Sequence, residues 1–325
     1  MSAVIEVRNL TKTYTEGMLR RSKFQALAGI SLDVKGGEIF GLLGPNGAGK
    51  TTFIKILLGI IAKSGGDAQM LDLPAGDRRS RRLVGYLPEH MRVPRHMTAW
   101  TALDFYGKLS GLPRSVVRER GERLLQTVGL TDRANDRVRK YSKGMLQRLG
   151  LAQALLHEPK LVILDEPTDG LDPVGRSHIR TILSDLKAQG TTVFLNSHIL
   201  QEVELICDRV AILDRGRLLR VGPVSEIRHG QPQQAQEVEQ GFDITLDVTA
   251  PQESVEQALN GVVQATNWEA LPGGVLRVTA HAAQQTSVDQ RVDRLRGANI
   301  SILGLARRQA SLEDAFLDIV GNTGE

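Results

Sequence analysis

The sequence has 325 residues, of which 41% are hydrophobic and 24% charged, and its formal net charge is +4. Such values are typical of a globular protein with about two domains and exclude a disordered chain. No segment approaches ~18 uninterrupted apolar residues, and the amino terminus lacks a basic start and an apolar core, so we expect neither a membrane span nor a secretory signal. The single cysteine, Cys207, suits a reducing compartment and is expected to be a small core residue.

Charge and aromatic content also limit the partners. Arginines cluster at 78–82 and 133–140. A solvated face explains such clusters most simply, and a surface that meets anionic lipid or a membrane protein is the alternative. Aromatic residues make up only 4% of the chain, fewer than base-stacking platforms require, so we expect no nucleic-acid partner.

The first two thirds of the chain alternate short apolar strands with helical segments. Strands are predicted at 4–8, 30–34, 38–43, 83–87, 161–165, 192–196, 210–213 and 217–221. Helices are predicted at 50–61, over most of 97–157 with breaks near 111–113 and 129–141, at 173–189 and from residue 198. This alternation favours an α/β domain with a mostly parallel sheet covered on both faces. We place that domain at 1–229, with a helical subdomain at about 97–157.

A second unit follows a polar stretch. Residues 230–241 are rich in Gln and are predicted to be a linker. Residues 242–325 then give the order βαββαβ, the ferredoxin-like α+β arrangement, followed by a closing helix with capping-box spacing at Ser311 and Asp314. We expect Trp268 and Phe316 to pack in its core. No cluster in it suggests a metal or catalytic site, so we predict a role in dimerisation or regulation.

Residues 44–51 read Gly-Pro-Asn-Gly-Ala-Gly-Lys-Thr, which fits G-x-x-x-x-G-K-[ST] between a predicted strand and helix. Glycines let backbone N–H groups surround phosphate oxygens, and a helix N-terminus adds a favourable dipole. Lys50 would reach the β- and γ-phosphates, and Thr51 would bind Mg²⁺. The candidate nucleotide-binding residues are Gly44, Pro45, Asn46, Gly47, Ala48, Gly49, Lys50, Thr51 and Thr52. A glycine turn without a ligand is the alternative, and the loop alone is shared by kinases, GTPases and helicases.

Two carboxylates end the predicted strand at 161–165. Asp165 suits Mg²⁺ coordination, and Glu166 suits a general base that polarises an attacking water. Two solvated acids at a strand end are the alternative. Upstream, Tyr141-Ser142-Lys143-Gly144-Met145 runs into a helix, where Ser142 is a plausible N-cap. By itself this segment indicates only a capped helix.

The order of these segments, continued by GLDP at 170–173 and LNSHI at 195–199, resembles the ABC-transporter ATPase family over about residues 4–229. The resemblance implies a P-loop NTPase fold of ABC type, ATP and Mg²⁺ as cofactors, and ATP hydrolysis. Ser142, Lys143, Gly144 and Met145 look like the Ser-Gly-Gly-Gln signature, from which Lys143 and Met145 depart. In the family this segment completes the ATP site of a partner subunit.

The same resemblance assigns four further residues. Asp172 matches the D-loop residue that contacts the partner, and His198 matches the switch histidine that holds the γ-phosphate and the water. Tyr14 matches the aromatic position that stacks on adenine, although an insertion-like stretch follows it. Glu89 stands where the family usually has Gln, as a possible Mg²⁺ ligand that adds negative charge beside Asp165.

One phosphate loop and one signature per chain imply a dimer with itself or a paralogue around two ATP molecules. The YSKGM signature, Glu89 and the ending ASLEDAFLDIVG resemble the bacterial drug, polysaccharide and gliding-type exporters. That implies a separate integral membrane permease and a peripheral location on the cytoplasmic face of the inner membrane. A soluble ABC ATPase acting on the ribosome or nucleic acid is the alternative, an importer is a variant of the transport class, and the transported substrate is not encoded.

Overall fold

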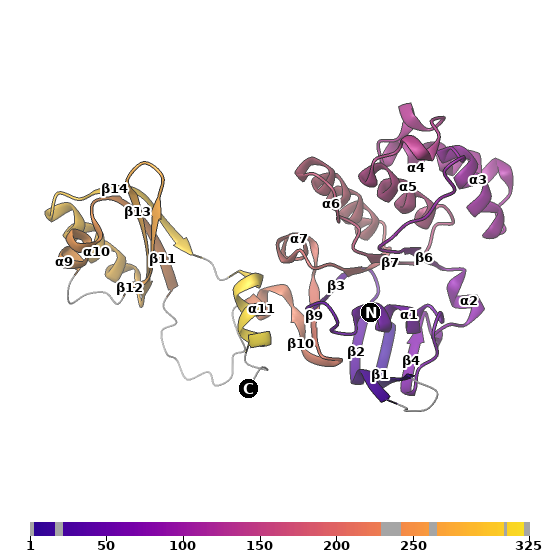
Figure 1. Cartoon of the computed structure of the whole chain (residues 1–325), viewed down its shortest axis with the longest axis horizontal. Coiled ribbons are helices and arrows are strands. Elements are labelled where there is room, and N and C mark those ends of the chain that lie inside the picture. Colours follow the sequence, from indigo (N-terminus) through magenta and orange to yellow (C-terminus); the bar gives the residue numbers. More distant parts are fainter. Residues whose placement is uncertain (1–2, 17–21, 229–241, 260–264, 309–310, 322–325) are drawn as a thin grey trace. The chain divides into compact units, whose positions relative to one another are not determined.

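The computed structural model describes residues 3–16, 22–228, 242–259, 265–308 and 311–321 (Figure 1). The chain forms two compact units. The first unit is Met1–His229 with Leu312–Glu325, and the second unit is Gly230–Ser311. The predicted linker at 230–241 lies outside the described residues.

A six-stranded, mostly parallel sheet organises the first unit. Its order is β10 (Arg217–Pro223), β9 (Arg209–Asp214), β3 (Ile39–Leu43), β8 (Thr192–Asn196), β7 (Leu161–Asp165) and β6 (Val84–Leu87). Only β10 pairs antiparallel with its neighbour, and the other pairs are parallel. The predicted parallel α/β sheet is therefore confirmed.

A smaller antiparallel sheet accompanies it, in the order β2 (Ser22–Lys35), β1 (Ala3–Glu16), β4 (Gly65–Met70) and β5 (Leu73–Pro74). The first two strands are longer than predicted. β4 was not predicted, because its sequence GGDAQM has few strand-forming residues. Pairing of β4 with β1, with Ile5 opposite Met70, supplies the order that local propensity lacks.

Helices cover both faces of the six-stranded sheet (Figure 1). α1 (Lys50–Leu57) lies with the small sheet on one face. The other helices before residue 229 are α2 (Arg78–Arg81), α3 (Ala99–Leu109), α4 (Arg114–Thr127), α5 (Lys143–Leu155), α6 (Pro173–Ala188), α7 (Leu200–Ile206) and α8 (Val224–Arg228). The predicted breaks are present: α3 ends before the Gly-Leu-Pro turn, and short 3₁₀ turns at Thr131–Arg133 and Val138–Lys140 precede α5.

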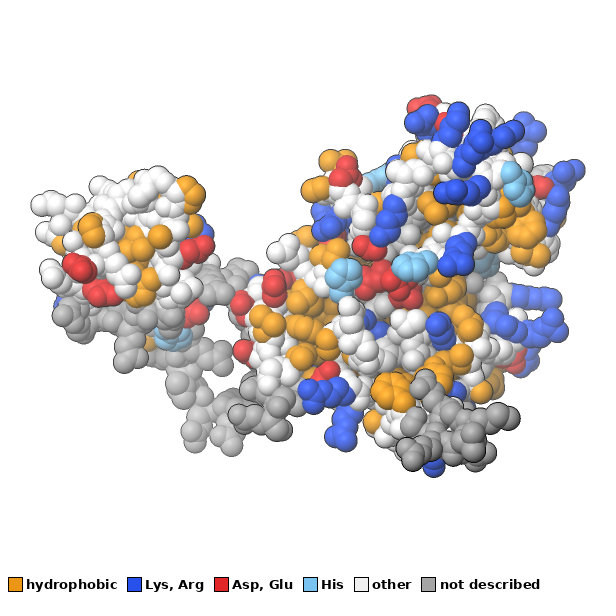
Figure 2. All heavy atoms as spheres, viewed as in Figure 1, with side chains coloured by type: hydrophobic (Ala, Val, Ile, Leu, Met, Phe, Trp, Pro, Cys, Tyr) orange, Lys and Arg blue, Asp and Glu red, His pale blue; other side chains and the backbone are white. Residues whose placement is uncertain are grey.

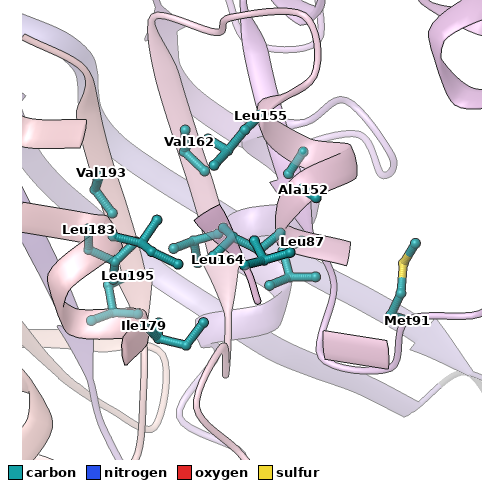
Figure 3. Close-up of a cluster of buried hydrophobic side chains, with 14 of the residues drawn as sticks. Leu87, Met91, Ala152, Leu155, Val162, Leu164, Ile179, Leu183, Val193 and Leu195 are labelled. Carbon is teal, nitrogen blue, oxygen red and sulfur yellow. The ribbon is translucent and has the colours of Figure 1, made fainter. Parts of the chain in front are cut away.

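The central strands send alternate side chains into two cores. Val162 and Leu164 of β7 enter the core under α5 and α6, whereas Leu161 and Ile163 enter the core shared with α1 and the small sheet. Figure 3 shows part of the first of these cores, with Val162 beside Leu155 and with Leu183 near Val193 and Leu195. A strand buried on both faces reads as a continuous apolar run, which is why these strands were visible in the sequence.

The second unit has the order β11 (Phe242–Thr249), α9 (Gln252–Leu259), β12 (Ala265–Leu271), β13 (Val275–Ala282), α10 (Gln285–Gly297) and β14 (Ser301–Arg308). Its antiparallel sheet runs β12-β13-β11-β14. This confirms the predicted βαββαβ unit. Trp268 packs against its core, as expected.

The closing helix, α11 (Leu312–Gly321), corrects the predicted domain boundary. It belongs to the first unit and contacts α7, α8 and β10. Leu312 is fully buried there, and Phe316 packs against the same core, so assigning Phe316 to the core of the second unit was wrong. The physical reason is that α9 and α10 already supply the helical side of the second core, through residues such as Val255 and Leu295.

Two further features concern helix length and the single cysteine. None of the helices in the described ranges combines the length and apolarity needed to cross a membrane. Cys207 is buried, and burial raises the pKa of its thiol, which keeps the thiol protonated. It is a small core residue.

Candidate functional site

The carboxyl ends of four parallel strands meet at one edge of the large sheet. β3 leads into the phosphate loop, β6 into Glu89, β7 into Glu166 and β8 into His198. They surround a cavity of about 600 Å³. Figure 2 shows acidic and histidine side chains gathered in the middle of this unit. The cavity is lined by Phe24, Ala26, residues 44–52, Glu89, Glu166, Asp169, Asn196, Ser197, His198, Leu200 and Phe316.

The phosphate loop has a backbone that glycine alone fits. Gly44 and Gly49 have φ values of 154° and 102°. A Cβ on Gly49 would lie 2.6 Å from the carbonyl oxygen of Ala26, and one on Gly44 would overlap the Leu213 carbonyl. α1 starts at Lys50 without a side-chain cap, so the N–H groups of its first turn are left for an anion.

Lys50 is buried inside this loop, with 7% of its surface exposed. Its Nζ donates to the carbonyl oxygens of Gly44 at 2.6 Å and Pro45 at 3.1 Å. Burial lowers the pKa of Lys50, and the charges of Glu166 and nearby acids oppose that shift. A buried ammonium held by neutral carbonyls favours an incoming phosphate, which brings the missing negative charge.

Asp165 is 2% exposed and accepts a hydrogen bond from Asn196 Nδ2. Burial raises its pKa, and the Asn196 bond and Lys50 oppose the shift. Asn196 Oδ1 is buried beside it and has no hydrogen-bond partner among the residues that the structure describes. Together with Thr51 and Glu89 on the cavity wall, these are hard oxygen donors of the kind that Mg²⁺ takes.

These donors fit Mg²⁺ only in combination with a ligand. Among the described residues there is no group of three or more His, Cys, Asp or Glu placed to hold a metal. Mg²⁺ in proteins usually keeps several waters and is bound by one or two carboxylates plus substrate phosphates. The residues present therefore suit a magnesium ion that arrives with a nucleotide.

Glu166 and His198 form a pair of ionisable side chains on the cavity wall. Glu166 Oε2 lies 2.7 Å from His198 Nδ1 and accepts the His198 backbone N–H at 3.3 Å. Gln147 donates to the Glu166 carbonyl at 3.0 Å. Burial raises the pKa of the Glu166 carboxyl, and His198 opposes that shift. The carboxylate is thus fixed in direction and more basic than a solvated one.

The backbone of Glu166 is strained as well. Its φ of 54° lies in the left-handed region, which in a residue other than glycine costs about 1–3 kcal/mol. Its N–H donates to the Asn196 carbonyl at 2.9 Å, so the neighbouring strand holds it in place. Strain at a cavity wall is typical of a functional position.

The predicted signature lies outside the described cavity wall. Ser142 is the N-cap of α5, and its Oγ accepts the Met145 N–H at 3.2 Å, which confirms the predicted cap. Gly144 sits where an added Cβ would come within 2.7 Å of the Leu171 side chain. The glycine therefore lets the start of α5 approach the loop after β7.

Lys143 and Asp172 also make contacts within the chain. Lys143 Nζ pairs with Asp169 at 2.6 Å, and this bond lowers the pKa of the Asp169 carboxyl. Asp172 caps α6 by accepting the Gly175 N–H at 2.7 Å. Asp169 reaches the cavity wall, so Lys143 touches the site through that residue.

Tyr14 lies on β1 directly opposite Phe24 of β2. Phe24, which is 60% exposed, lines the cavity with Ala26, and Tyr14 is not among the lining residues of the described chain. Sequence reasoning missed Phe24 because it ends the stretch interpreted as an insertion. The hairpin register, which puts it across from Tyr14, becomes visible only in the fold.

Asp169, Leu200 and Phe316 were missed too. Asp169 could have been found, since it lies between Glu166 and Asp172 in one short loop. Leu200 follows the histidine closely but has no chemical signature. Phe316 could not have been found, because only the packing of α11 on the first unit brings it to the cavity.

Comparisons with known proteins agree with this geometry. A family model described as ABC transporter matches residues 27–169. An ABC transporter ATP-binding protein of Synechocystis sp. is 40% identical over 97% of this chain and 84% of its own. The bacitracin transport ATP-binding protein BcrA of Bacillus licheniformis is 33% identical over 99% of this chain and 98% of its own.

A solved structure, a dimeric bacterial ABC transporter cassette, is 25% identical with a TM-score of 0.62 and covers 67% of this chain and 98% of its own. Its match supports the P-loop fold of ABC type for the first unit. Together with the full-length relatives and the phosphate-loop cavity, it identifies the protein's class: the chain belongs to the ABC transporter family, as an ATP-binding subunit with an ATPase site.

Proposed function

We propose that two subunits of this kind close around two Mg²⁺–ATP molecules and that hydrolysis drives a separate membrane subunit that exports its substrate. The observation that carries the proposal is the Glu166–His198 pair, 2.7 Å apart on the wall of a cavity that also holds the phosphate loop. A carboxylate with a raised pKa beside phosphate-binding groups suits hydrolysis by an activated water.

Each site residue then has one task. Lys50 and backbone N–H groups of the phosphate loop would bind the phosphates, and Thr51 with Asp165 would hold a magnesium ion, whose charge would offset that of the phosphate oxygens. Glu89 is a further oxygen donor at the same place. Glu166 takes a proton from the attacking water, and His198 orients Glu166 and contacts the γ-phosphate. Phe24 offers a flat apolar wall for the base, with Tyr14 behind it on the same hairpin.

The dimer is supported by signature and D-loop residues that do not line the ATP cavity of their own chain. Ser142, Gly144 and Asp172 lie outside the wall of their own subunit's cavity. In a dimer they would face the ATP of the other subunit, and a relative of solved structure is dimeric. Mixing Lys50→Ala chains with Ser142→Arg chains tests this, because only mixed dimers would contain one complete site.

The expected result is recovery of part of the ATP turnover on mixing, with each variant nearly inactive alone. No recovery, in a mixture whose mixed dimers are verified by mass, would contradict shared sites. The matched control is Arg217→Glu, at an exposed residue of β10 that is not among those lining the cavity, which should neither inactivate nor rescue.

The membrane partner is supported by a basic groove of about 730 Å³ between β6 and the ends of α3 and α5. Arg81, Arg82 and Lys108 line it with Leu109, and Leu109 is 70% exposed. Exposed apolar and cationic side chains in one groove suit an intracellular segment of a membrane protein.

The groove is joined to the ATP cavity by a short segment. Tyr86 of β6 lines the groove, and Glu89, just after β6, lines the cavity. Burial and the charges of Asp165 and Glu89 raise the pKa of Tyr86 to about 12, so the phenol stays neutral between the two sites. A partner in the groove would therefore press on the element that carries Glu89.

Export at the cytoplasmic face of the inner membrane is part of the proposal, and transport is supported by relatives that match nearly the whole chain. One of them is a bacitracin transport subunit. The test is purification of the tagged chain from its own membranes. A polytopic protein should come along, and Arg81→Glu with Arg82→Glu should release it while Arg217→Glu keeps it. Association with ribosomes instead would favour the soluble alternative.

A further inference from the structure

The last helix of the chain is built into the unit that binds ATP. α11 is reached only after the chain has passed through the whole second unit. Even so, Leu312 is 0% exposed in the core of the first unit, and Phe316 and Ile319 pack against that core. The helix therefore completes the first unit and does not merely follow the second.

One carboxylate binds the two segments of the first unit that flank the second unit in the sequence. Glu204 of α7 accepts the backbone N–H of Leu312, the first residue of α11, at 3.0 Å. The same side chain pairs at 3.1 Å with Arg228, the last residue of α8 before the chain leaves the first unit. Both partners of that ion pair are about one fifth exposed, so water screens it only in part.

α7 is also the helix that follows the switch loop. It begins at Leu200, directly after the loop that carries His198, and it has no side-chain cap at its N-terminus. Packing must therefore fix its position. Glu202 of α7 accepts two hydrogen bonds of 2.8 Å from Arg180 of α6, and α11 also packs against α7.

Phe316 connects α11 to the cavity itself. It lines the cavity together with His198 and Leu200, and Leu200 packs against the same core as Phe316. His198 in turn holds the Glu166 carboxylate through its ring and its backbone N–H. The last helix therefore packs on α7, and its Phe316 reaches the same cavity wall as the His198 loop and the strained glutamate.

We infer that α11 is a positioning element of the ATPase site: Phe316 fixes the His198 loop, and Glu204 couples that position to the end of α8 and the start of α11. Truncating Phe316 would let α7 and the His198 loop shift. A displacement of about 1 Å in a catalytic arrangement can cost up to ~10²-fold in rate. The inference concerns ATP hydrolysis by the purified chain and does not depend on the membrane partner.

The test compares neighbours on one helix, Phe316→Ala and Leu317→Ala, in the full-length chain. Leu317 is 61% exposed and serves as the matched control. We expect Phe316→Ala to lower kcat about tenfold with KM changed by less than about twofold, because the phosphate loop is untouched. Leu317→Ala should match the wild type, and Phe316→Leu should retain most of the activity.

A double variant separates positioning from general loss of structure. If Phe316 acts through the histidine, Phe316→Ala should cost nothing further in a His198→Ala background. The same tenfold loss in both backgrounds, or a rise in KM with kcat unchanged, would overturn the inference. Should thermal unfolding show that Phe316→Ala does not fold, the milder truncation Phe316→Val in the two backgrounds gives the same comparison, with a smaller expected loss of kcat.

A separate variant tests the contacts of Glu204 with Arg228 and Leu312. Glu204→Gln keeps an acceptor for the Leu312 N–H but removes the charge that pairs with Arg228. We expect kcat to fall about threefold, with no further fall when His198 is Ala. An unchanged kcat would overturn the coupling through Glu204. A wild-type chain without any ATP turnover would instead contradict the ATPase function, which steady-state turnover of the wild type and of Glu166→Gln tests separately.

Discussion

The two units differ in how deeply they bury ionisable side chains. Both place helices on a sheet. At the edge of its sheet the first unit buries Lys50, Asp165 and Glu166, and burial shifts the pKa of each toward the neutral form. The second unit keeps its ion pair between Arg277 and Asp247 at the surface, where burial has little effect.

This contrast indicates where the chemistry is. Buried ionisable groups whose pKa values are shifted by burial reduce the stability of the fold, and such groups cluster at functional sites. Of the described residues in the second unit, only Arg291 is a buried ionisable group, and it belongs to α10, away from any cavity wall that we describe. The predictions below are ordered by expected size and are meant to break or sharpen this difference.

The largest effect is expected from Glu166→Gln. Removal of a general base should lower ATP turnover by roughly 10²–10⁴-fold while leaving ATP binding intact. Steady-state turnover and equilibrium binding of ATP measure the two quantities. Turnover close to that of the wild type would contradict the role given to Glu166.

The same variant should raise stability. The folded-state pKa of Glu166 lies above its unfolded value, so the folded state binds the proton more tightly. The stabilising contribution of the neutral form is present below the unfolded pKa and is lost as pH rises through the folded pKa. At neutral pH the ionised carboxylate therefore destabilises the fold. Urea unfolding should show a higher free energy for Glu166→Gln at pH 7, and a gain that persists at acid pH would contradict this explanation.

Lys50→Ala should weaken ATP binding by roughly 10²-fold or more, because a buried charge facing the phosphates is lost. Since Lys50 is itself an unfavourably buried cation, the free energy of unfolding should change little. Binding of a fluorescent ATP analogue measures the affinity. Lys63→Ala, at an exposed lysine after the same helix, is the control and should bind as the wild type does.

Leu164→Ala tests the scaffold. Leu164 is fully buried in the core under α5 and α6 (Figure 3), and truncation should lower the free energy of unfolding by about 2–5 kcal/mol. The transition of the second unit should remain at its position in a calorimetric scan. A shift of both transitions together would show that the two units unfold as one.

The smallest effect is expected in the second unit. Arg291 is 4% exposed, and its Nε and Nη1 have no partner among the described residues, although one nitrogen donates to the His281 carbonyl. Arg291→Met should therefore raise the free energy of unfolding by about 1 kcal/mol, because an uncompensated buried charge is removed. ATP turnover should not change. A loss of stability would indicate that the cation serves a purpose in this unit.

The sequence predicted what is local. The phosphate loop, the carboxylates after β7 and the histidine after β8 were recognised because each follows an apolar strand, and parallel strands bring such ends together. β4 and β5 were missed. The sequence of β4, GGDAQM, has little strand propensity and is ordered by pairing with β1, and the two residues of β5 pair in turn with β4.

Long-range packing accounts for the rest. Phe24 depends on the register of a hairpin, and Phe316 depends on a helix that returns to the first unit from the far end of the chain. The helix itself was predicted correctly, but the spacing of its apolar residues does not indicate which core they join. The predicted boundary at residue 242 therefore placed α11 in the second unit.

The pH dependence of kcat tests the central claim most directly, that a buried Glu166 held by His198 is the base for ATP hydrolysis. Because burial raises the pKa of Glu166, kcat should fall with acid along a limb whose midpoint lies above the ordinary carboxyl value of 4.5. In Glu166→Gln the residual activity should lack that limb. A limb of the same midpoint in the variant, or none in the wild type, would contradict the account.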